Sequence, residues 1–136
     1  MTALATDRRT PERNGDHREF PLAAATRLYA GSMAALNASG ELVPMSTSTT
    51  LTSVGRSEAQ ADNSTGAAGD ITGRIKSGIF RFANSAAADE ITDTDIGATC
   101  YGVDDQTVAK TDGTGTRSLA GKIFDVDAQG VWVDFR

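Results

Sequence analysis

The chain has 136 residues, a formal net charge of −5 at pH 7 and an apolar fraction of 39%. This length accommodates one domain with a tail, and the acidic balance argues against a protein that binds nucleic acid or anionic lipid. No apolar run approaches the roughly 20 residues of a membrane span, and residues 1–20 lack the apolar stretch of a secretory signal. Small side chains dominate, so we expect a thin core that gains stability by oligomerising or by docking on something larger.

Residues 1–20 differ in composition from the rest of the chain. Four arginines and four carboxylates balance one another between residues 6 and 19, with almost no apolar residue among them. Such a segment cannot bury enough surface to fold alone. It is either a disordered tail or an arm that becomes ordered on a partner. The folded part is predicted to begin at Phe20-Pro21, which gives an arm of residues 1–20 and a β-rich domain of residues 21–136.

The first half of the domain is predicted to form short strands. Residues 28–36 are predicted as one strand that bends at Gly31. A tight turn at residues 37–40 follows, because Asn37 opens a type I turn and Gly40 suits the left-handed position. Pro44 ends the next strand because it offers no N–H. Residues 46–54 are β-prone, and the chain is expected to leave the strand at Gly55.

The second half contains the richest apolar run and a closing hairpin. Ile71 and Ile75 share one strand face, whereas Phe80 and Phe82 have the opposite parity. A one-residue slip near residues 77–78, as in a β-bulge, reconciles the two sets. Thr92 could cap one helical turn, and short strands are predicted at residues 99–103 and 106–110. Residues 120–135 are predicted as strand, turn and strand, with the same turn pattern as residues 36–40.

The pattern as a whole predicts a mainly β fold. We expect a small antiparallel β-barrel or β-sandwich built from short hairpins, with at most one short helix. In the last strand Val131, Val133 and Phe135 share one face, so Trp132 points to the other. Trp132 therefore either covers a small second cluster or anchors an interface.

Few residues could carry chemistry. His17 is the single histidine and lies in the polar arm, which argues against a Ser-His-Asp triad and against most zinc sites. Cys100 is the single cysteine and is expected to be a buried apolar residue. We therefore expect no catalytic residue, metal or cofactor, and a protein that is not an enzyme.

Paired acidic residues leave one alternative open. Residues 125–130 resemble the start of a calcium loop, but Gln129 replaces an acidic ligand and Arg136 stands where the bidentate Glu belongs. Turn formation and solubility explain this run better. Carboxylate pairs for glycoside cleavage are not excluded by the sequence, although one Trp and two Tyr make a poor surface for stacking sugars.

A series of short turn and strand signatures resembles a known family. The series comprises residues 29–31, 37–44, 54–56, 61–63, 76–85, 96–97, 100–101, 104–108, 120–121 and 130–133. In this order they are similar to the small capsid decoration, or cement, proteins of tailed bacteriophages. The resemblance covers residues 27–135 and includes no catalytic motif. The arm lies outside it.

The resemblance implies a structural virion protein on the outer surface of a phage capsid. Such a protein would bind the major capsid protein, often as a homotrimer, and stabilise the shell without nucleic acid or membrane. Arg8, Arg9 and Arg13 of the arm would pair with shell carboxylates, and Phe20 would enter an apolar groove. Trp132 is a further interface candidate. The alternative is a head-fibre or tail-associated module that binds a host surface or glycan.

Overall fold

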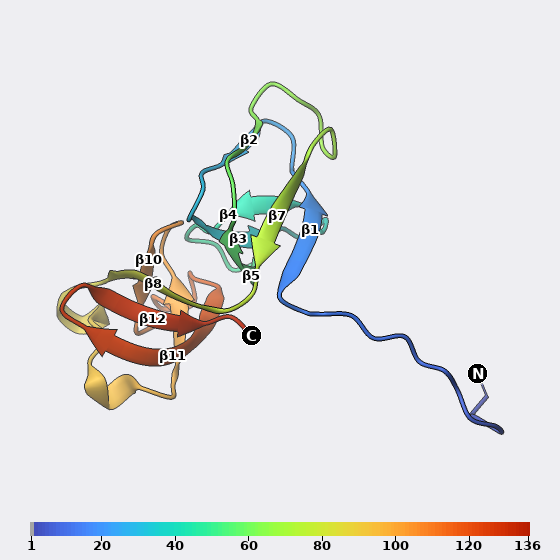
Figure 1. Cartoon of the computed structure of the whole chain (residues 1–136). Helices are drawn as coiled ribbons and strands as arrows, with labels where there is room; N and C mark the ends of the chain where they lie inside the picture. Colours follow the sequence, from blue (N-terminus) through green and yellow to red (C-terminus); the bar gives the residue numbers. More distant parts are fainter. Residues whose placement is uncertain (1) are drawn as a thin grey trace.

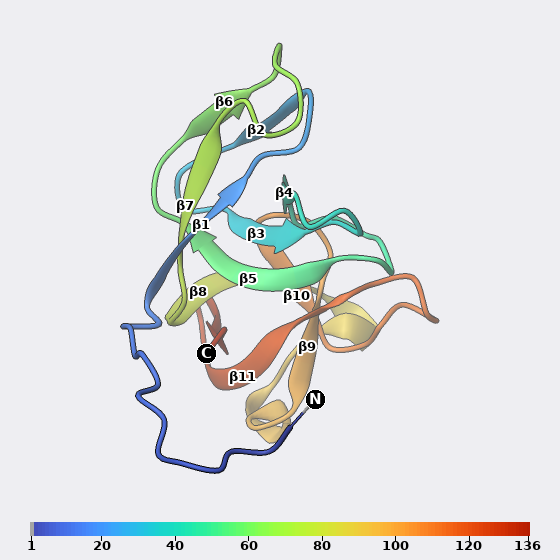
Figure 2. The same ribbon diagram turned by 90° about the vertical axis from the view of Figure 1, so that its right-hand side faces the viewer.

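The computed structural model describes residues 2–136 and is mainly β, as the sequence predicts. It contains two lobes, seen one above the other in Figure 2. The elements are β1 His17–Pro21, β2 Thr26–Leu28, β3 Met33–Leu36, β4 Leu42–Pro44, β5 Thr52–Ser57, β6 Ala61–Asn63, β7 Thr72–Lys76, β8 Ile79–Asn84, η1 Ala87–Asp89, η2 Asp93–Asp95, β9 Thr99–Gly102, β10 Thr107–Ala109, β11 Leu119–Asp127 and β12 Gly130–Asp134. The helical content of residues 2–136 is limited to the three-residue 3-10 turns η1 and η2.

The N-terminal lobe is a rolled sheet. Its strands lie in the order β1-β7-β5-β3-β4, and a β-bridge between Leu22 and Leu42 joins its two ends. The Ala23 N–H donates to the Leu42 carbonyl at 3.1 Å at the same point. A two-stranded ribbon of β2 and β6 stands beside this sheet. Rolling lets short strands enclose a small core, whose buried members are Leu22, Leu28, Ala34, Leu42, Val54 and Ile75.

The C-terminal lobe is a closed barrel with strand order β10-β8-β12-β11-β9 (Figure 1). All its pairs are antiparallel except β8 with β10, which is parallel. Val131 and Val133 are fully buried inside it, as the alternation of β12 predicts. Cys100 is also buried there, in agreement with the expectation for the thiol, and burial raises the pKa of that thiol to about 12.

Strand β3 belongs to both cores. Successive side chains of a strand point to opposite faces. Met33 and Ala35 pack into the barrel cluster, whereas Ala34 packs into the core of the N-terminal lobe. This explains why the run Met33–Leu36 is apolar at every position, as in a strand covered on both faces. The two lobes therefore share one strand rather than being joined by a loose linker.

Polar contacts strengthen the junction between the lobes. The Met33 N–H donates to the Asp105 carbonyl at 2.8 Å, and the Thr47 hydroxyl donates to the Val103 carbonyl at 2.9 Å. Ser118 connects the same surfaces, because its Oγ accepts from the Leu51 N–H at 3.1 Å. The junction is thus built from both backbone and side-chain hydrogen bonds.

Three sequence predictions are corrected by the structure. Residues 28–36 do not form one bent strand: β2 pairs with β6, β3 pairs with β4 and β5, and the chain changes sheets around Gly31. The strand predicted over residues 46–54 starts only at Thr52 and continues through Gly55 to Ser57. At residues 77–78 the chain does not merely slip by one residue but passes from the sheet to the barrel, so Ile75 and Phe82 face different cores.

Both predicted turns form, but their loops differ in length. Asn37 Oδ1 accepts from the Ser39 N–H at 2.9 Å and Gly40 has φ of +77°, as a type I turn with a left-handed glycine requires. In the second turn Asp127 Oδ1 accepts from the Gln129 N–H at 2.8 Å. Here Gly130 pairs directly with Asp127, which shortens the loop by one residue relative to the first turn.

Candidate interaction surfaces

The N-terminal arm is the most exposed part of the chain. Every residue from 2 to 17 is exposed, and the arm leads away from the body in Figure 1. Its root is fixed where the Ser77 N–H donates to the Asp16 carbonyl at 2.7 Å. The arm therefore starts at the junction between the two lobes.

Strand β1 begins at His17, so the predicted arm boundary at residue 20 falls inside a strand. Arg18 and Phe20 face inward, because β1 pairs with β7 and these two residues lie opposite Ile75 and Gly73. Phe20 packs against the core of the N-terminal lobe, with the Arg18 guanidinium 5.2 Å from the centre of its ring. Phe20 is thus held by its own lobe rather than by the free arm, contrary to the role expected for it. The sequence offered little signal for this strand, because His17, Arg18 and Glu19 are all polar and Phe20 is the first apolar residue of the run.

Arginines surround the root of the arm. Arg13, Arg18 and Arg74 line a hollow of about 550 Å³ together with His17, Glu19 and Phe20. The Arg18 guanidinium donates to the Val54 carbonyl at 3.2 Å. None of the three arginines forms an ion pair with a carboxylate of residues 2–136. This cluster is suited to a carboxylate or another anion supplied by a partner.

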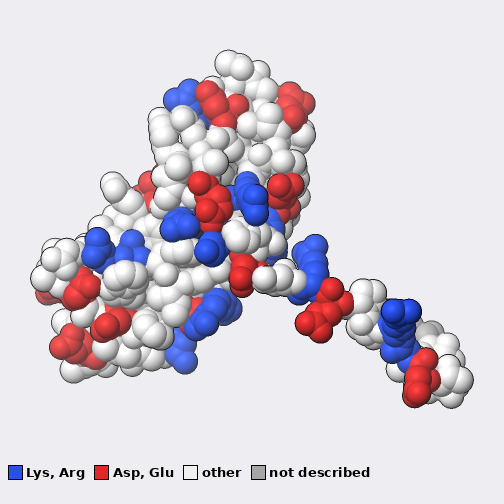
Figure 3. Space-filling view, in the orientation of Figure 1, with Lys and Arg blue, Asp and Glu red and all other residues white. Residues whose placement is uncertain are grey.

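The remaining arm arginines of the sequence prediction, Arg8 and Arg9, lie farther out and are exposed. They too have no ion-pair partner within the part of the chain that the structure describes. Figure 3 shows charges of both signs alternating along the arm, with further basic and acidic side chains interspersed over the body. The arm can therefore meet a surface of mixed charge.

Trp132 lies on the outer face of the barrel and is half-buried. Its indole N–H donates to Asp127 Oδ2 at 2.8 Å, and the Arg81 guanidinium lies 5.6 Å from the centre of its ring. These contacts hold the indole in one orientation and lower the pKa of Asp127, with the indole hydrogen bond as the largest cause. Trp132 thus forms a small outer cluster of its own and still presents part of its ring.

A groove runs between the lobes along β8 and was not predicted from the sequence. We define the interlobe groove as two adjoining hollows of about 530 and 470 Å³ that share Gly31, Arg81 and Phe82. Tyr29 and Asp105 border one hollow; Arg56 and Trp132 border the other. Arg56 lies 4.2 Å from the centre of the Phe80 ring. Because these residues come from five separate segments, local sequence patterns could not place them together.

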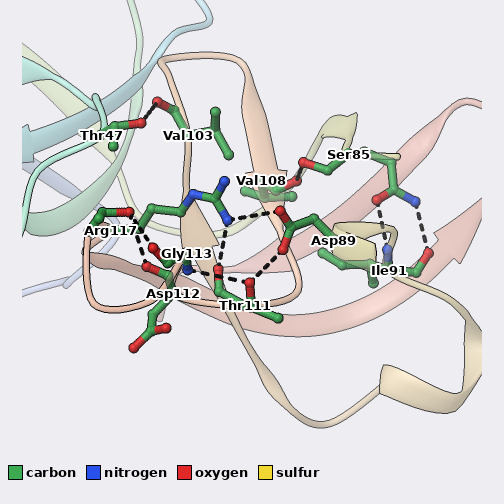
Figure 4. A network of polar contacts seen from close by, with 12 residues as sticks. Thr47, Ser85, Asp89, Ile91, Val103, Val108, Thr111, Asp112, Gly113 and Arg117 are labelled. Atoms are coloured by element: carbon green, nitrogen blue, oxygen red, sulfur yellow. Dashed lines mark hydrogen bonds and ion pairs between the residues drawn. The ribbon is translucent and has the colours of Figure 1, made fainter. Parts of the chain in front are cut away.

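A polar network braces the loops of the barrel (Figure 4). Asp89 of η1 accepts from the Thr111 hydroxyl at 2.5 Å and pairs with the Arg117 guanidinium at 3.2 Å. Both contacts lower the pKa of Asp89, the Thr111 hydrogen bond most. Arg117 also donates to the Thr111 carbonyl at 3.1 Å. The network fixes the glycine-rich loop at residues 112–116 against η1 and so serves the fold.

The paired carboxylates singled out in the sequence act mainly as turn acceptors. Asp95 caps η2 by accepting from the Thr92 N–H at 2.8 Å and pairs with Lys110 at 3.3 Å, both of which lower its pKa. Asp104 accepts from the Gln106 N–H at 2.9 Å. Within residues 2–136 no three His, Cys, Asp or Glu side chains come close enough to hold a metal ion. The same residues include no helix with the length and hydropathy needed to cross a bilayer.

Comparison with protein-family models, with curated proteins and with solved structures found no match for this chain. The resemblance to capsid decoration proteins therefore stays a prediction from turn and strand signatures.

Proposed function

We propose that this chain is a structural virion protein that binds the outer surface of a bacteriophage capsid and stabilises the lattice of its major capsid protein. The observation that carries the proposal is the exposed N-terminal arm, anchored at Asp16 and surrounded at its root by arginines without an ion-pair partner. The turn and strand signatures shared with decoration proteins support it. The protein works by contact, not by catalysis.

The arm supplies the contacts that make binding specific for the capsid shell. Ordering a chain segment costs about 1–2 kcal/mol per residue, so an arm of this kind needs charge-assisted contacts to remain bound. Arg8, Arg9 and Arg13 would form them with carboxylates of the capsid protein. Arg18 and Arg74 extend the same basic area onto the body, since they line the hollow at the arm root.

The body supplies stiffness. Its lobes share β3 and a set of hydrogen bonds, so they present one rigid unit to a lattice. Assembly as a homotrimer would multiply modest arm contacts by avidity, because binding by one arm raises the effective concentration of the others. A standard protein interface buries roughly 1,600 Å² in total, and three arms together can reach this area.

The proposal is tested by binding to phage particles stripped of decoration protein. The full-length chain should bind in many copies over the shell, and deletion of residues 2–16 should abolish most of this binding while the β body stays folded by circular dichroism. Arg9→Glu should weaken binding, and the weakening should be larger at low salt than at high salt. Lys122→Glu is the matched control, since it reverses one exposed charge on β11.

Two outcomes would overturn the proposal. One is absence of binding to any stripped particle by the full-length chain. The other is unchanged occupancy after deletion of residues 2–16. Binding in only a few copies at one vertex or at the tail would instead indicate the head-fibre or tail-associated role.

A further inference from the structure

Strand β8 has one edge that is open over most of its length. One edge pairs with β12 from Ile79 to Phe82. The other edge pairs with β10 only at Ala83 and Asn84. An open strand edge offers unpaired backbone donors and acceptors to a further strand.

Hydrogen-bond parity identifies the open groups. The Gly78 carbonyl accepts from the Phe135 N–H at 2.9 Å, and the Phe82 carbonyl lies against Gly130, so even-numbered residues bond toward β12. On the opposite side the Ala83 N–H donates to the Gln106 carbonyl at 2.8 Å. Peptide groups alternate along a strand, so those of Ile79 and Arg81 point the same way as Ala83. Neither has a backbone partner on that side within residues 2–136.

This edge faces the interlobe groove. The segment Tyr29–Ser32 forms the opposite wall. Outside residues 30–32, no atom of the protein lies within 4 Å of the place where a Cβ of Gly31 would stand. The groove wall at Gly31 is therefore open, and Ile79 and Arg81 line the same hollow.

The outer edge of β1 is protected, in contrast to that of β8. Backbone groups of β1 that point away from β7 belong to His17, Glu19 and Pro21, since Asp16 and Leu22 bond toward β7. Two of these residues carry ionisable side chains that are exposed, and Pro21 has no N–H to donate. Charged residues and proline are the usual means of blocking unwanted strand pairing. Strand β8 has no proline, and the Arg81 side chain is turned onto the Trp132 ring.

We propose that the interlobe groove binds residues 2–6 of the arm of a second copy of this chain, added as a strand to β8. The segment is Thr2-Ala3-Leu4-Ala5-Thr6. Strand alternation puts Leu4 and both threonines on one face and the two alanines on the other. The small alanines allow close approach to β8, and Leu4, which is 73% exposed in the free arm, gains contact with apolar groups of the groove such as the Tyr29 ring. Main-chain hydrogen bonds of this kind are the basis of strand-addition recognition.

Charge and reach agree with this occupant. Arg81 and Asp105 both border the groove and neither forms an ion pair with residues 2–136. Asp7, which directly follows the docking segment, supplies a carboxylate for Arg81. Residues 7–16 span about 33 Å when extended, and the arm leads away from the body in Figure 1. In this arrangement the occupied groove belongs to a neighbouring molecule, and the contact is head-to-tail, as in a ring.

The first test is the oligomeric state of the isolated protein, which does not depend on the capsid role. By native mass measurement the full-length chain should form concentration-dependent oligomers. Leu4→Asp should weaken association by about ten-fold or more, because it places a charge where an apolar side chain is buried. Thr10→Asp is the matched control, since it adds the same charge to the arm outside the docking segment, and should leave association unchanged.

The second test is disulfide trapping between two differently tagged chains, one with Leu4→Cys and one with Gln106→Cys. Gln106 borders the groove and is exposed, and the native Cys100 is buried. The mixed disulfide should form faster than with Thr10→Cys in place of Leu4→Cys. Equal rates for the two arm positions would overturn the proposal. So would a monomeric disulfide in a chain that carries both Leu4→Cys and Gln106→Cys, because the arm would then occupy its own groove.

Discussion

The shared strand β3 predicts that the two lobes unfold together. Ile75 is 1% exposed in the core of the N-terminal lobe, and Ile123 is 1% exposed in the barrel core. Replacing either with alanine leaves a cavity and should lower the free energy of unfolding by about 2–5 kcal/mol. If the lobes are coupled, Ile75→Ala should destabilise the barrel as much as its own lobe.

The assay uses the single tryptophan. Trp132 lies on β12, so its fluorescence reports on the barrel alone, whereas far-UV circular dichroism reports on the strands of both lobes. With a urea m value of about 2 kcal/mol/M, a loss of about 3 kcal/mol moves the midpoint by about 1.5 M. For Ile75→Ala both probes should shift together by this amount. For Ile96→Ala, which truncates a side chain that is 47% exposed, the change should stay within about 0.5 kcal/mol.

The reasoning fails if Ile75→Ala produces an early transition by circular dichroism while the Trp132 transition keeps its midpoint. Such a result would mean that β3 does not transmit the loss of one core to the other. The lobes would then be independent units, and the stiffness argument for a lattice-binding body would lose its basis.

Three further predictions concern local contacts. The pKa of Asp127 is lowered mainly by the hydrogen bond from the Trp132 indole N–H. The ionised Asp127 therefore stabilises the fold fully above the unfolded pKa of about 3.9, and this stabilisation is lost as the pH falls through the lower folded pKa. Trp132 fluorescence should change in that acid range, and Asp127→Asn should remove the change. Burial raises the pKa of Cys100 to about 12, so a thiol reagent at pH 8 should label the native protein only as fast as it unfolds, and rapid labelling would contradict the burial. Gly55→Ala should lower the melting temperature more than Gly40→Ala, because both residues have positive φ but only at Gly55 would a Cβ collide with backbone, the Lys76 carbonyl; equal effects would contradict this.

Turns and strand faces could be predicted from the sequence because their causes are local. Asn37 and Asp127 form the expected side-chain hydrogen bonds to the backbone, and Val131 and Val133 follow the two-residue period of a strand. The sequence also indicates correctly that Ile75 and Phe80 cannot share one face of a single regular strand. The meaning of this change of parity, a passage from one core to another, depends on partners far away in the chain.

What could not be predicted depends on long-range pairing. Leu28 and Met33 are five residues apart, yet one pairs with β6 and the other lies opposite Arg56 of β5. The sequence predicts the arm arginines as interaction residues from their charge and Trp132 from strand parity. It assigned Phe20 to the arm because composition does not show that β1 pairs with β7. The interlobe groove required Tyr29 and Arg81 to be brought together by the fold.

Edge protection connects the fold with the two proposals. A protein with small cores and many short strands has many edges, and open edges promote aggregation. Most of these edges are closed by the Leu22–Leu42 bridge and by the barrel, and that of β1 carries charges and Pro21. The edge of β8 stays open but borders the interlobe groove, where we propose that the alanine-containing segment of residues 2–6 pairs with it. A molecule that must assemble with copies of itself on a surface, and not elsewhere, gains from an edge of this kind, because pairing then requires one particular segment.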